Sequence, residues 1–551
     1  MIKLTPRLPG WEHYTVGETE NYTVGGTEIW VKGPDSGQIH ETVASIRPAN
    51  LKAYLQGLRG HFAIVVRAPT FSFAAVDRIR SIPLIWLGSE LGVVVAQHAE
   101  QMIGGFPFTP DQVNPDGELA IAMSGYTVGR DTLYSDVSQL GPGQFLLIED
   151  EITVGQYHRY EPWKPVPRPR EELLADLTKV TVEVFQRLMD EANGRTIAIP
   201  LSAGWDSRLV ASSLRSYRNV VCFSYGLRGN HEAKTAQRVA EALGFDWHFI
   251  PYSPRRMRKA FASEDHEQFV RSADSMTSIH FPQEYLALRE KLPDDSIIVN
   301  GQSGDFISGN HIPAALMVTS PGLSAEARRD RVIDALLSKH YNLWGHLCTP
   351  KNFARMRARL TQEIEALGGM PDPDGDHGIY EALEFQNRQA KYVINGQRVY
   401  DHCGYDWSLP LWSDEYLNFW QGVPLEAKIN QNLYREMCQS QNWGDVWDIP
   451  INNKTIRPRW LIPFRTAAKL AHAPLGRERW HAFERRFLGY WMENLCGYPV
   501  SYMTSILDAR PRRNSNSYHV ESYLRCASNA SIYHAMRCGW TRGKWRDPLQ
   551  L

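Results

Sequence analysis

Cysteine is scarce in this chain of 551 residues and unevenly placed along it. All seven cysteines lie between Cys222 and Cys538, so the first 221 residues contain none. They form no CxxC pair, and their odd number argues against a complete disulfide framework. We therefore expect a reduced, cytoplasmic protein.

Long apolar runs and an excess of either charge are also absent. The first residues, MIKLTPRLPGWEH, lack the apolar core of a signal peptide, and no run approaches transmembrane length. Lys and Arg number 60 against 61 Asp and Glu, which gives a formal net charge of -1. We expect no membrane insertion and no nucleic-acid partner. Nothing in the composition indicates an oligomeric state.

The length predicts two or three domains, because one hydrophobic core rarely serves so long a chain. The first part is mostly β in pattern, with alternating apolar segments at 61–68, 71–76 and 91–96. The similar segments YTVGETEN (14–21) and YTVGGTEI (22–29) are typical of two strands of one hairpin.

A segment rich in proline and charge, WKPVPRPREE at 163–172, is interpreted as a linker. The expected domains are therefore residues 1–165 and 166–551. Behind the linker, strands alternate with helices, which predicts βαβ units and a parallel sheet, and from about 315 onward helices dominate. The expected elements are helices at 171–192, 206–217 and 231–244, strands at 195–202, 219–226 and 247–252, and a strand with its loop at 296–305.

The stretch SAGWDS at 202–207 joins a predicted strand to a predicted helix. In a parallel sheet, ligands bind where strand ends meet helix N-termini. Gly204 permits a tight turn, and the hydroxyls of Ser202 and Ser207 with the first N–H groups of the helix favour an anion. Asp206 would oppose that anion unless Mg²⁺ lies between them. Alternatively, Asp206 is an N-cap and the serines are turn residues. Neither GxxxxGK[ST] nor GxGxxG is present.

A second loop, VNGQSGDFISGNH at 299–311, also follows an apolar strand. Gly301, Gly304 and Gly309 surround Asp305 in it. Two small-residue loops that each end a strand and each carry one aspartate suit a triphosphate, with Mg²⁺ held by both carboxylates. An ordinary loop with several glycines is the alternative.

Both loops resemble motifs of the asparagine synthetase family. SAGWDS is similar to its SGGxDS pyrophosphate loop, NGQSGDFISG to its second loop, SGEGxDExxGG, and CFSYG with the following helix to its adenine-side strand. Ala203 replaces a glycine and Phe306 an acidic residue. The resemblance implies a PP-loop (adenine nucleotide α-hydrolase-like) parallel-sheet domain with many C-terminal helices, which cleaves ATP between the α and β phosphates. It implies nucleotide contacts from Leu201, Ser202, Gly204, Asp206, Ser207, Tyr225, Asn300, Gly301 and Gly304, and Mg²⁺ ligation by Asp206 and Asp305.

The front half resembles the class II glutaminase domain of the same family. LRGHFAIVV, AAVDRIRSIPLIW and TLYSDVSQLGPGQFLLI carry this resemblance, which implies an Ntn-hydrolase-like αββα sandwich. Glutamine-dependent members use an N-terminal cysteine as nucleophile, whereas this chain begins Met1-Ile2-Lys3. We expect the fold without glutamine hydrolysis, as in β-lactam synthetase and carbapenam synthetase. Lasso-peptide cyclases and amide synthetases of surface-polysaccharide formation are further relatives.

The resemblance implies AMP-forming amide synthesis, in which a carboxylate is adenylated, pyrophosphate leaves and an amine attacks. The second step needs a base and a cation. GYDWSLPLWSDEYLNFW resembles the family segment VEARVPFLD, which makes Asp406 the expected base, with Tyr405 beside it. Alternatively, Asp406 is a solvated loop residue. Lys454 is the expected cation, and Lys428 and Arg457 are the alternatives.

The expected substrates are a small-molecule carboxylate and an amine or ammonia. A uronic acid, an amino-acid derivative and a peptide carboxylate are all compatible with the sequence, and similarity to polysaccharide-cluster relatives favours the first. Two other hypotheses are a non-catalytic scaffold of the same fold and an enzyme supplied by a separate glutaminase. The late tryptophans are interpreted as core residues rather than as a sugar-stacking surface. They are Trp407, Trp412, Trp420, Trp443, Trp447 and Trp460.

Overall fold

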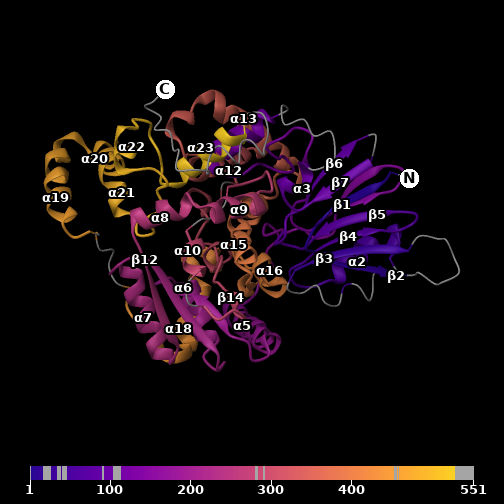
Figure 1. The fold of residues 1–551 in the computed structure, drawn as a ribbon, viewed down its shortest axis with the longest axis horizontal. Helices are drawn as coiled ribbons and strands as arrows, with labels where there is room; N and C mark the ends of the chain where they lie inside the picture. Colours follow the sequence, from indigo (N-terminus) through magenta and orange to yellow (C-terminus); the bar gives the residue numbers. More distant parts are fainter. Residues whose placement is uncertain are drawn as a thin grey trace.

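Two α/β bodies make up most of the molecule. In Figure 1 the N-terminal part of the chain lies at the right, and the later part surrounds a second sheet. None of the helices within the described ranges combines the length and apolarity that crossing a bilayer requires. The computed structural model describes residues 2–527 except 17–25, 34–38, 40–45, 90–91, 104–112, 280–282, 290–291, 320, 452–455 and 457.

The N-terminal domain contains two sheets. One has the strand order β1-β7-β6-β8 and the other β10-β9-β5-β4-β3-β2. β2 and β3 pair antiparallel, with Tyr14 opposite Ile29, which agrees with the outer residues of the predicted hairpin, while its residues 17–25 lie outside the described residues. The strands are β1 (Leu4–Arg7), β2 (Glu12–Val16), β3 (Thr27–Lys32), β4 (Ala63–Arg67), β5 (Ser72–Val76), β6 (Ile85–Ser89), β7 (Gly92–Ala96), β8 (Ser138–Gln139), β9 (Gln144–Ile148) and β10 (Ile152–Gln156).

Alternation of side chains along these strands gives each sheet two buried faces. Val93 and Val95 of one sheet share a core with Val65 and Val76 of the other. On the outer faces, α2 (Leu51–Gly57) covers the six-stranded sheet, and α3 (Ala99–Ile103) and α4 (Pro115–Ser124) cover the four-stranded sheet. The layers therefore run α–β–β–α, as the sequence predicts. A relationship to Ntn hydrolases stays a prediction.

The predicted linker, 163–172, is irregular as far as residue 169, but its last three residues begin α5, which starts at Arg170. Side chains nevertheless tie the two bodies together. Buried Lys391 of the second body donates to the carbonyl oxygens of Thr127 and Gly129 in the first, at 2.9 and 2.7 Å. The domain boundary at residue 165 stays a prediction that falls within this irregular segment.

The second body is built on a parallel five-stranded sheet with the order β13-β12-β11-β14-β15. From β11 the chain proceeds outward on one side to β12 and β13, and then returns to place β14 on the other side of β11. Such a reversal of strand order marks the ligand site of open α/β sheets. The elements are α5 (Arg170–Ala192), β11 (Ile197–Pro200), α6 (Trp205–Ser213), β12 (Val220–Leu227), α7 (His231–Leu243), β13 (Asp246–Tyr252), β14 (Ile297–Val299) and β15 (Asp406–Ser408).

Helices dominate after β14, as the sequence predicts. One of them, η7 (Phe385–Val393), is a π-helix that continues α14 directly. The α-helices are α8 (Pro254–Phe261), α9 (Glu264–Ala273), α10 (Tyr285–Leu288), α11 (Gly304–Ile307), α12 (Ala325–His340), α13 (Pro350–Ala366), α14 (Asp376–Glu384), α15 (Arg398–Cys403), α16 (Asp414–Gln421), α17 (Leu425–Lys428), α18 (Asn432–Gln441), α19 (Leu461–His472), α20 (Arg477–Phe483), α21 (Gly489–Met492), α22 (Tyr502–Leu507) and α23 (Asn516–Ala527).

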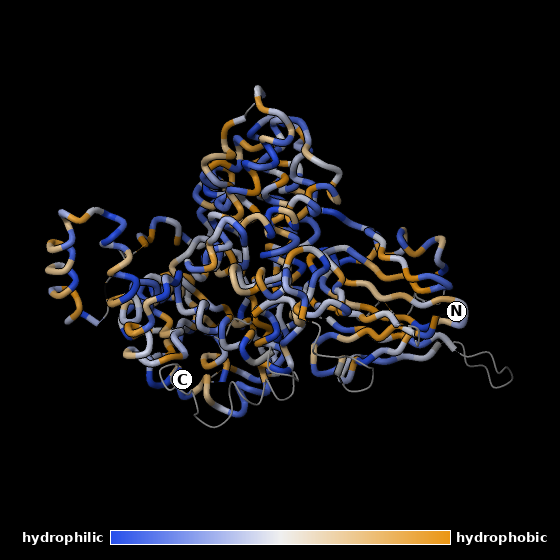
Figure 2. The backbone as a smooth tube through the Cα atoms, turned by 90° about the horizontal axis from the view of Figure 1, so that it is seen from above, coloured by the Kyte–Doolittle hydropathy of each residue, from blue (hydrophilic) through white to orange (hydrophobic). Residues whose placement is uncertain are grey.

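The late tryptophans divide into two groups. Trp407, Trp412, Trp420 and Trp447 are buried and Trp443 is half-buried against the same core, which confirms the interpretation of these five as core residues. Trp460 is 53% exposed and precedes α19, so it does not belong to that core. Figure 2 shows α19 extending away from the rest of the molecule, at the end opposite the N-terminal domain.

Candidate active site

The two glycine-containing loops meet because their strands, β11 and β14, are neighbours in the sheet. The backbone N–H of Asp305 donates to Oδ2 of Asp206 at 2.8 Å. A Cβ atom on Gly301 would lie 2.6 Å from the backbone carbonyl carbon of Asp206, and one on Gly304 would lie 2.7 Å from its carboxylate oxygen. The loops can therefore touch only because glycine stands at both positions.

In the first loop, Gly204 is the N-cap of α6 and supplies no capping side chain. Asp206 stands in the first turn and points to the second loop, which excludes the alternative that it is an N-cap. The hydroxyls of Ser202 and Ser207 lie 2.9 Å apart. The start of α6 can thus present its N–H groups to an anion. The backbone at Ala203 has no positive φ, so alanine causes no strain there.

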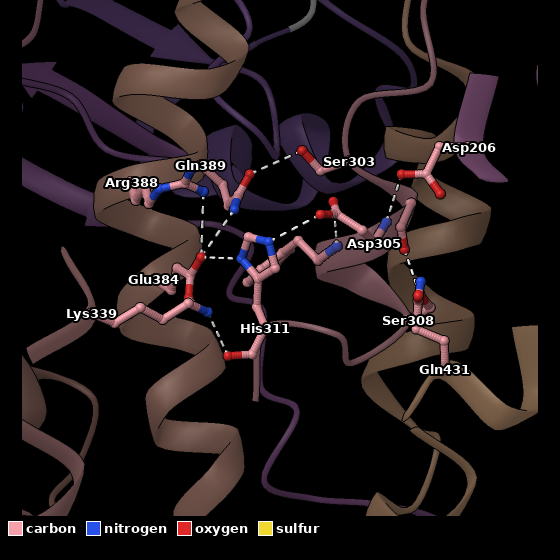
Figure 3. Close-up of polar contacts among 12 residues, drawn as sticks. Asp206, Ser303, Asp305, Ser308, His311, Lys339, Glu384, Arg388, Gln389 and Gln431 are labelled. Atoms are coloured by element: carbon pink, nitrogen blue, oxygen red, sulfur yellow. Dashed lines mark hydrogen bonds and ion pairs between the residues drawn. The ribbon is translucent and has the colours of Figure 1, made fainter. Parts of the chain in front are cut away.

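A histidine missed by the sequence reasoning connects the second loop to helix α14 (Figure 3). His311 Nε2 lies 3.1 Å from Oδ2 of Asp305, and its Nδ1 contacts Oε1 of Glu384. Glu384 is buried and also lies 3.0 Å from Nε2 of His340. Lys339 Nζ donates to the backbone carbonyl of His311. Asp305 is thereby held in one orientation.

The π-helix η7 contributes one wall of this region. Its wider turn lets Glu384 receive hydrogen bonds from both Arg388 and Gln389, four and five residues later, at 3.5 and 3.2 Å. Gln389 Oε1 also accepts from the hydroxyl of Ser303 at 3.1 Å. The wall is therefore bonded to the second loop (Figure 3), and the charge of Arg388 on this wall contributes to lowering the pKa of Asp305.

The two aspartates differ in their electrostatics. Burial and the neighbouring charge of Asp305 raise the pKa of Asp206 to about 7. Burial would also raise the pKa of Asp305, but the hydrogen bond and charge of His311 outweigh it, so that pKa is lowered. Two carboxylates on loops in direct contact, one of them resisting ionisation because of the charge of the other, suit a divalent cation with oxygen ligands such as Mg²⁺.

The number of available side-chain ligands limits how a metal ion could be bound here. Among the described residues, no group of three or more His, Cys, Asp and Glu side chains is arranged to hold an ion. A cation between Asp206 and Asp305 would take further ligands from phosphates and water, as Mg²⁺ commonly does.

The remaining predicted nucleotide contacts lie at the same edge of the sheet. The carbonyl oxygen of Leu201 accepts from the hydroxyl of Ser224 at 2.6 Å. Tyr225 stacks on Tyr252, with ring centroids 5.3 Å apart. Asn300 is buried, and its Oδ1 accepts from the N–H of Gln302 at 3.0 Å.

The structure thus brings together the loop residues that the sequence assigns to ATP and Mg²⁺. Residues 186–440 match the family model for asparagine synthase. We name these residues the asparagine synthase region after this similarity, and they contain both loops. The similarity implies ATP-dependent carbon–nitrogen ligase activity in general. No curated protein sequence matches the chain significantly.

Two predicted catalytic residues of the asparagine synthase region do not lie at its site. Asp406 pairs in register with Ile297 at the start of β14, whereas the loop residues follow the end of that strand. Its side chain is 60% exposed and forms an ion pair with Arg195 at 2.7 Å. Tyr405 donates to the carbonyl of Leu288. The prediction of Asp406 as the base, with Tyr405 beside it, is corrected, because this segment lies at the amino ends of the parallel strands, whereas both loops follow the carboxyl ends.

The three residues considered as the catalytic cation cannot be placed at the site. Lys454 and Arg457 lie outside the described residues. Lys428 is fully buried, and its ammonium group contacts both carboxylate oxygens of Glu381 at 3.2 and 3.1 Å. Lys428 is therefore part of a buried ion pair behind the loop.

Phe306 stands where the family motif has an acidic residue, and its packing explains this difference. Its side chain is completely buried and stacks on Trp412, with ring centroids 5.8 Å apart. An aromatic residue here anchors the second loop in the core, while the neighbouring Asp305 faces the site.

Three site residues of the asparagine synthase region escaped the sequence reasoning. Tyr434 donates to Oδ1 of Asp206 at 3.0 Å. His311 stands six residues after Asp305, and this proximity was a usable signal. Tyr434 and Glu384 lie on later helices, so only the folded chain shows that they belong here.

Proposed function

We propose that the protein is an AMP-forming amide synthetase. It adenylates a small-molecule carboxylate with ATP, releases pyrophosphate and transfers the acyl group to an amine or ammonia. The observation that carries this proposal is the direct contact between Asp206 and Asp305 at the reversal of strand order.

The residues of the two loops have separate tasks in this reaction. The first N–H groups of α6 and the hydroxyls of Ser202 and Ser207 bind phosphate oxygens. Asp206 and Asp305 would hold Mg²⁺, which when bound would supply positive charge to neutralise the leaving pyrophosphate. His311 keeps Asp305 oriented.

Positive groups beside the second loop suit the carboxylate substrate. Arg388 and Lys339 both contact Glu384 at the site, at 3.5 and 3.6 Å. A guanidinium group attracts and orients a carboxylate, which must approach the α phosphate in spite of the phosphate charge. A uronic acid is the substrate class that we favour, followed by amino-acid derivatives.

The amine comes from a source other than glutamine hydrolysis by this chain. The N-terminal domain has no cysteine that could serve as the nucleophile, because the first cysteine of the chain is Cys222. We expect no glutamate to form when the protein is incubated with glutamine and Mg-ATP, and we expect ammonia or a substrate amine to support amide formation.

Nucleotide binding is the first test. Calorimetric titration of the full chain with Mg-ATP should show one binding event that Asp206→Ala abolishes. Asp406→Ala is the matched control, since it removes a carboxylate at the amino ends of the strands, away from the two loops at the carboxyl ends. Absence of binding to the unsubstituted protein would refute the proposal and favour the scaffold hypothesis.

Exchange of labelled pyrophosphate into ATP is the second test. A panel of uronic acids, amino acids and their derivatives should contain acids that start the exchange, with AMP released once an amine is added. If Mg-ATP binds but ADP and phosphate are the products, AMP-forming chemistry is refuted.

A further inference from the structure

The hairpin of α19 and α20 presents an apolar surface that no described part of the chain covers. The chain exposes twelve large apolar side chains in its described residues, and five of them stand between 460 and 475. They are Trp460 (53% exposed), Ile462 (42%), Phe464 (65%), Leu470 (71%) and Leu475 (48%).

The helical period collects most of these side chains on one face of α19. The spacing i, i+3, i+4, i+7 and i+10 from Trp460 defines one stripe, and all of its members are exposed. We call it the α19 stripe; its residues are Trp460, Pro463, Phe464, Ala467 and Leu470.

The opposite face of α19 already has partners. Leu461 is buried with Trp480, Arg465 bonds Glu484 at 2.6 Å, and the His472 ring lies 4.4 Å from Phe483. Packing within the hairpin therefore occupies this face. In the α19 stripe, Trp460 also contacts Trp491, with ring centroids 5.8 Å apart, but every member of the stripe remains exposed. Figures 1 and 2 both place α19 at the far end of the molecule, where a flat surface could reach it.

The charge of the hairpin indicates what kind of surface binds to the α19 stripe. Residues 458–492 contain seven Arg and Lys against two Glu, although the whole chain has a net charge of -1. A second copy of this hairpin would bring like charges together, whereas an anionic surface would be attracted. Tryptophan and phenylalanine beside arginine and lysine are the side chains that settle at the boundary of lipid head groups and acyl chains.

We propose that the α19 stripe docks on an anionic lipid bilayer. Trp460, Phe464 and Leu470 enter the boundary of the head groups, and exposed Lys469 contacts lipid phosphates. This is contact from one side, which differs from the membrane insertion that the sequence argues against, and the described helices cannot span a bilayer.

Cosedimentation of the full chain with vesicles tests this surface. Vesicles of phosphatidylcholine with roughly one-third phosphatidylglycerol should bind the protein, and pure phosphatidylcholine should bind it several-fold less. Phe464→Ser with Leu470→Ser should lower the partition coefficient by at least about tenfold, because two large apolar side chains no longer leave water. Lys469→Glu should weaken binding to the anionic vesicles only.

The control replaces two exposed valines on other elements, Val182→Ser with Val318→Ser, which are 52% and 68% exposed. This control should bind vesicles unchanged, and all variants should keep the melting temperature and the Mg-ATP affinity of the parent. Failure of the parent to bind anionic vesicles would overturn the proposal. So would equal binding by the stripe variant, or a dimer that the stripe substitutions dissociate without any vesicle binding.

Discussion

Replacement of Asp206 by asparagine should separate nucleotide binding from stability. The carboxylate accepts from the N–H of Asp305 through Oδ2 and from Tyr434 through Oδ1. An asparagine oxygen can keep the first bond, and the tyrosine hydroxyl can accept from the new amide. The substitution therefore removes a charge with little change of shape.

The expected gain in stability follows from the pKa of Asp206, which burial and Asp305 raise from 3.8 to about 7. As pH rises through this interval, the unfolded chain releases the proton before the folded protein does, so the wild type loses stability. This difference in pKa corresponds to a loss of about 4 kcal/mol in the free energy of unfolding at pH 8. Because Asp206 is only partly buried, solvent screens the charge, and we expect about 2 kcal/mol.

Thermal denaturation at two pH values measures this difference. Asp206→Asn should melt about 3 °C above the wild type at pH 8 and together with it near pH 4. Its Kd for Mg-ATP should rise by at least about tenfold, because one of two metal-binding carboxylates is gone. A variant that is less stable than the wild type at pH 8, or equally stabilised at both pH values, would refute the electrostatic reasoning.

Three further substitutions test other parts of the structure. Asp406→Asn removes an exposed ion pair with Arg195, so the rate of ATP–pyrophosphate exchange should stay within about twofold of the wild type, and a large loss would restore Asp406 to the mechanism. Phe306→Ala should cost about 3–5 kcal/mol in the free energy of unfolding, measured by urea denaturation, because the ring is completely buried. Lys428→Met should cost about 3–5 kcal/mol by leaving the carboxylate of Glu381 buried and unpaired. The double substitution with Glu381→Leu should recover most of this loss, and no recovery would contradict the ion-pair explanation.

Local sequence patterns were sufficient for four strands of the parallel sheet, β11 to β14, and for its two aspartate loops. The alternation of strands and helices between residues 171 and 252 predicts α5 to β13, and Gly244 ends α7 in the left-handed conformation as expected. The two aspartate loops could be paired in advance, because each follows a buried strand and loops at the carboxyl ends of neighbouring parallel strands converge.

The helical part could not be predicted in the same way. β15 is three residues long, and its register with β14 depends on contacts distant in sequence. The resemblance to VEARVPFLD therefore assigned Asp406 to the site, although it lies at the amino ends of the strands. Glu384 and Tyr434 reach the site from α14 and α18, whose packing no local period reveals. The apolar side chains of α19 likewise resemble core residues in the sequence, and only the folded chain shows that most of them are exposed.

The neighbouring position of β11 and β14 also affects how the protein matures during synthesis. Asp206 and Asp305 are 99 residues apart, and Tyr434 follows much later, so a growing chain that has emerged only as far as α7 holds one aspartate of the pair. On the proposed function, Mg-ATP would have no complete site until β14 has entered the sheet. The nucleotide would then favour the finished arrangement over every partly assembled one, and the substrate would stabilise the protein only late in its synthesis.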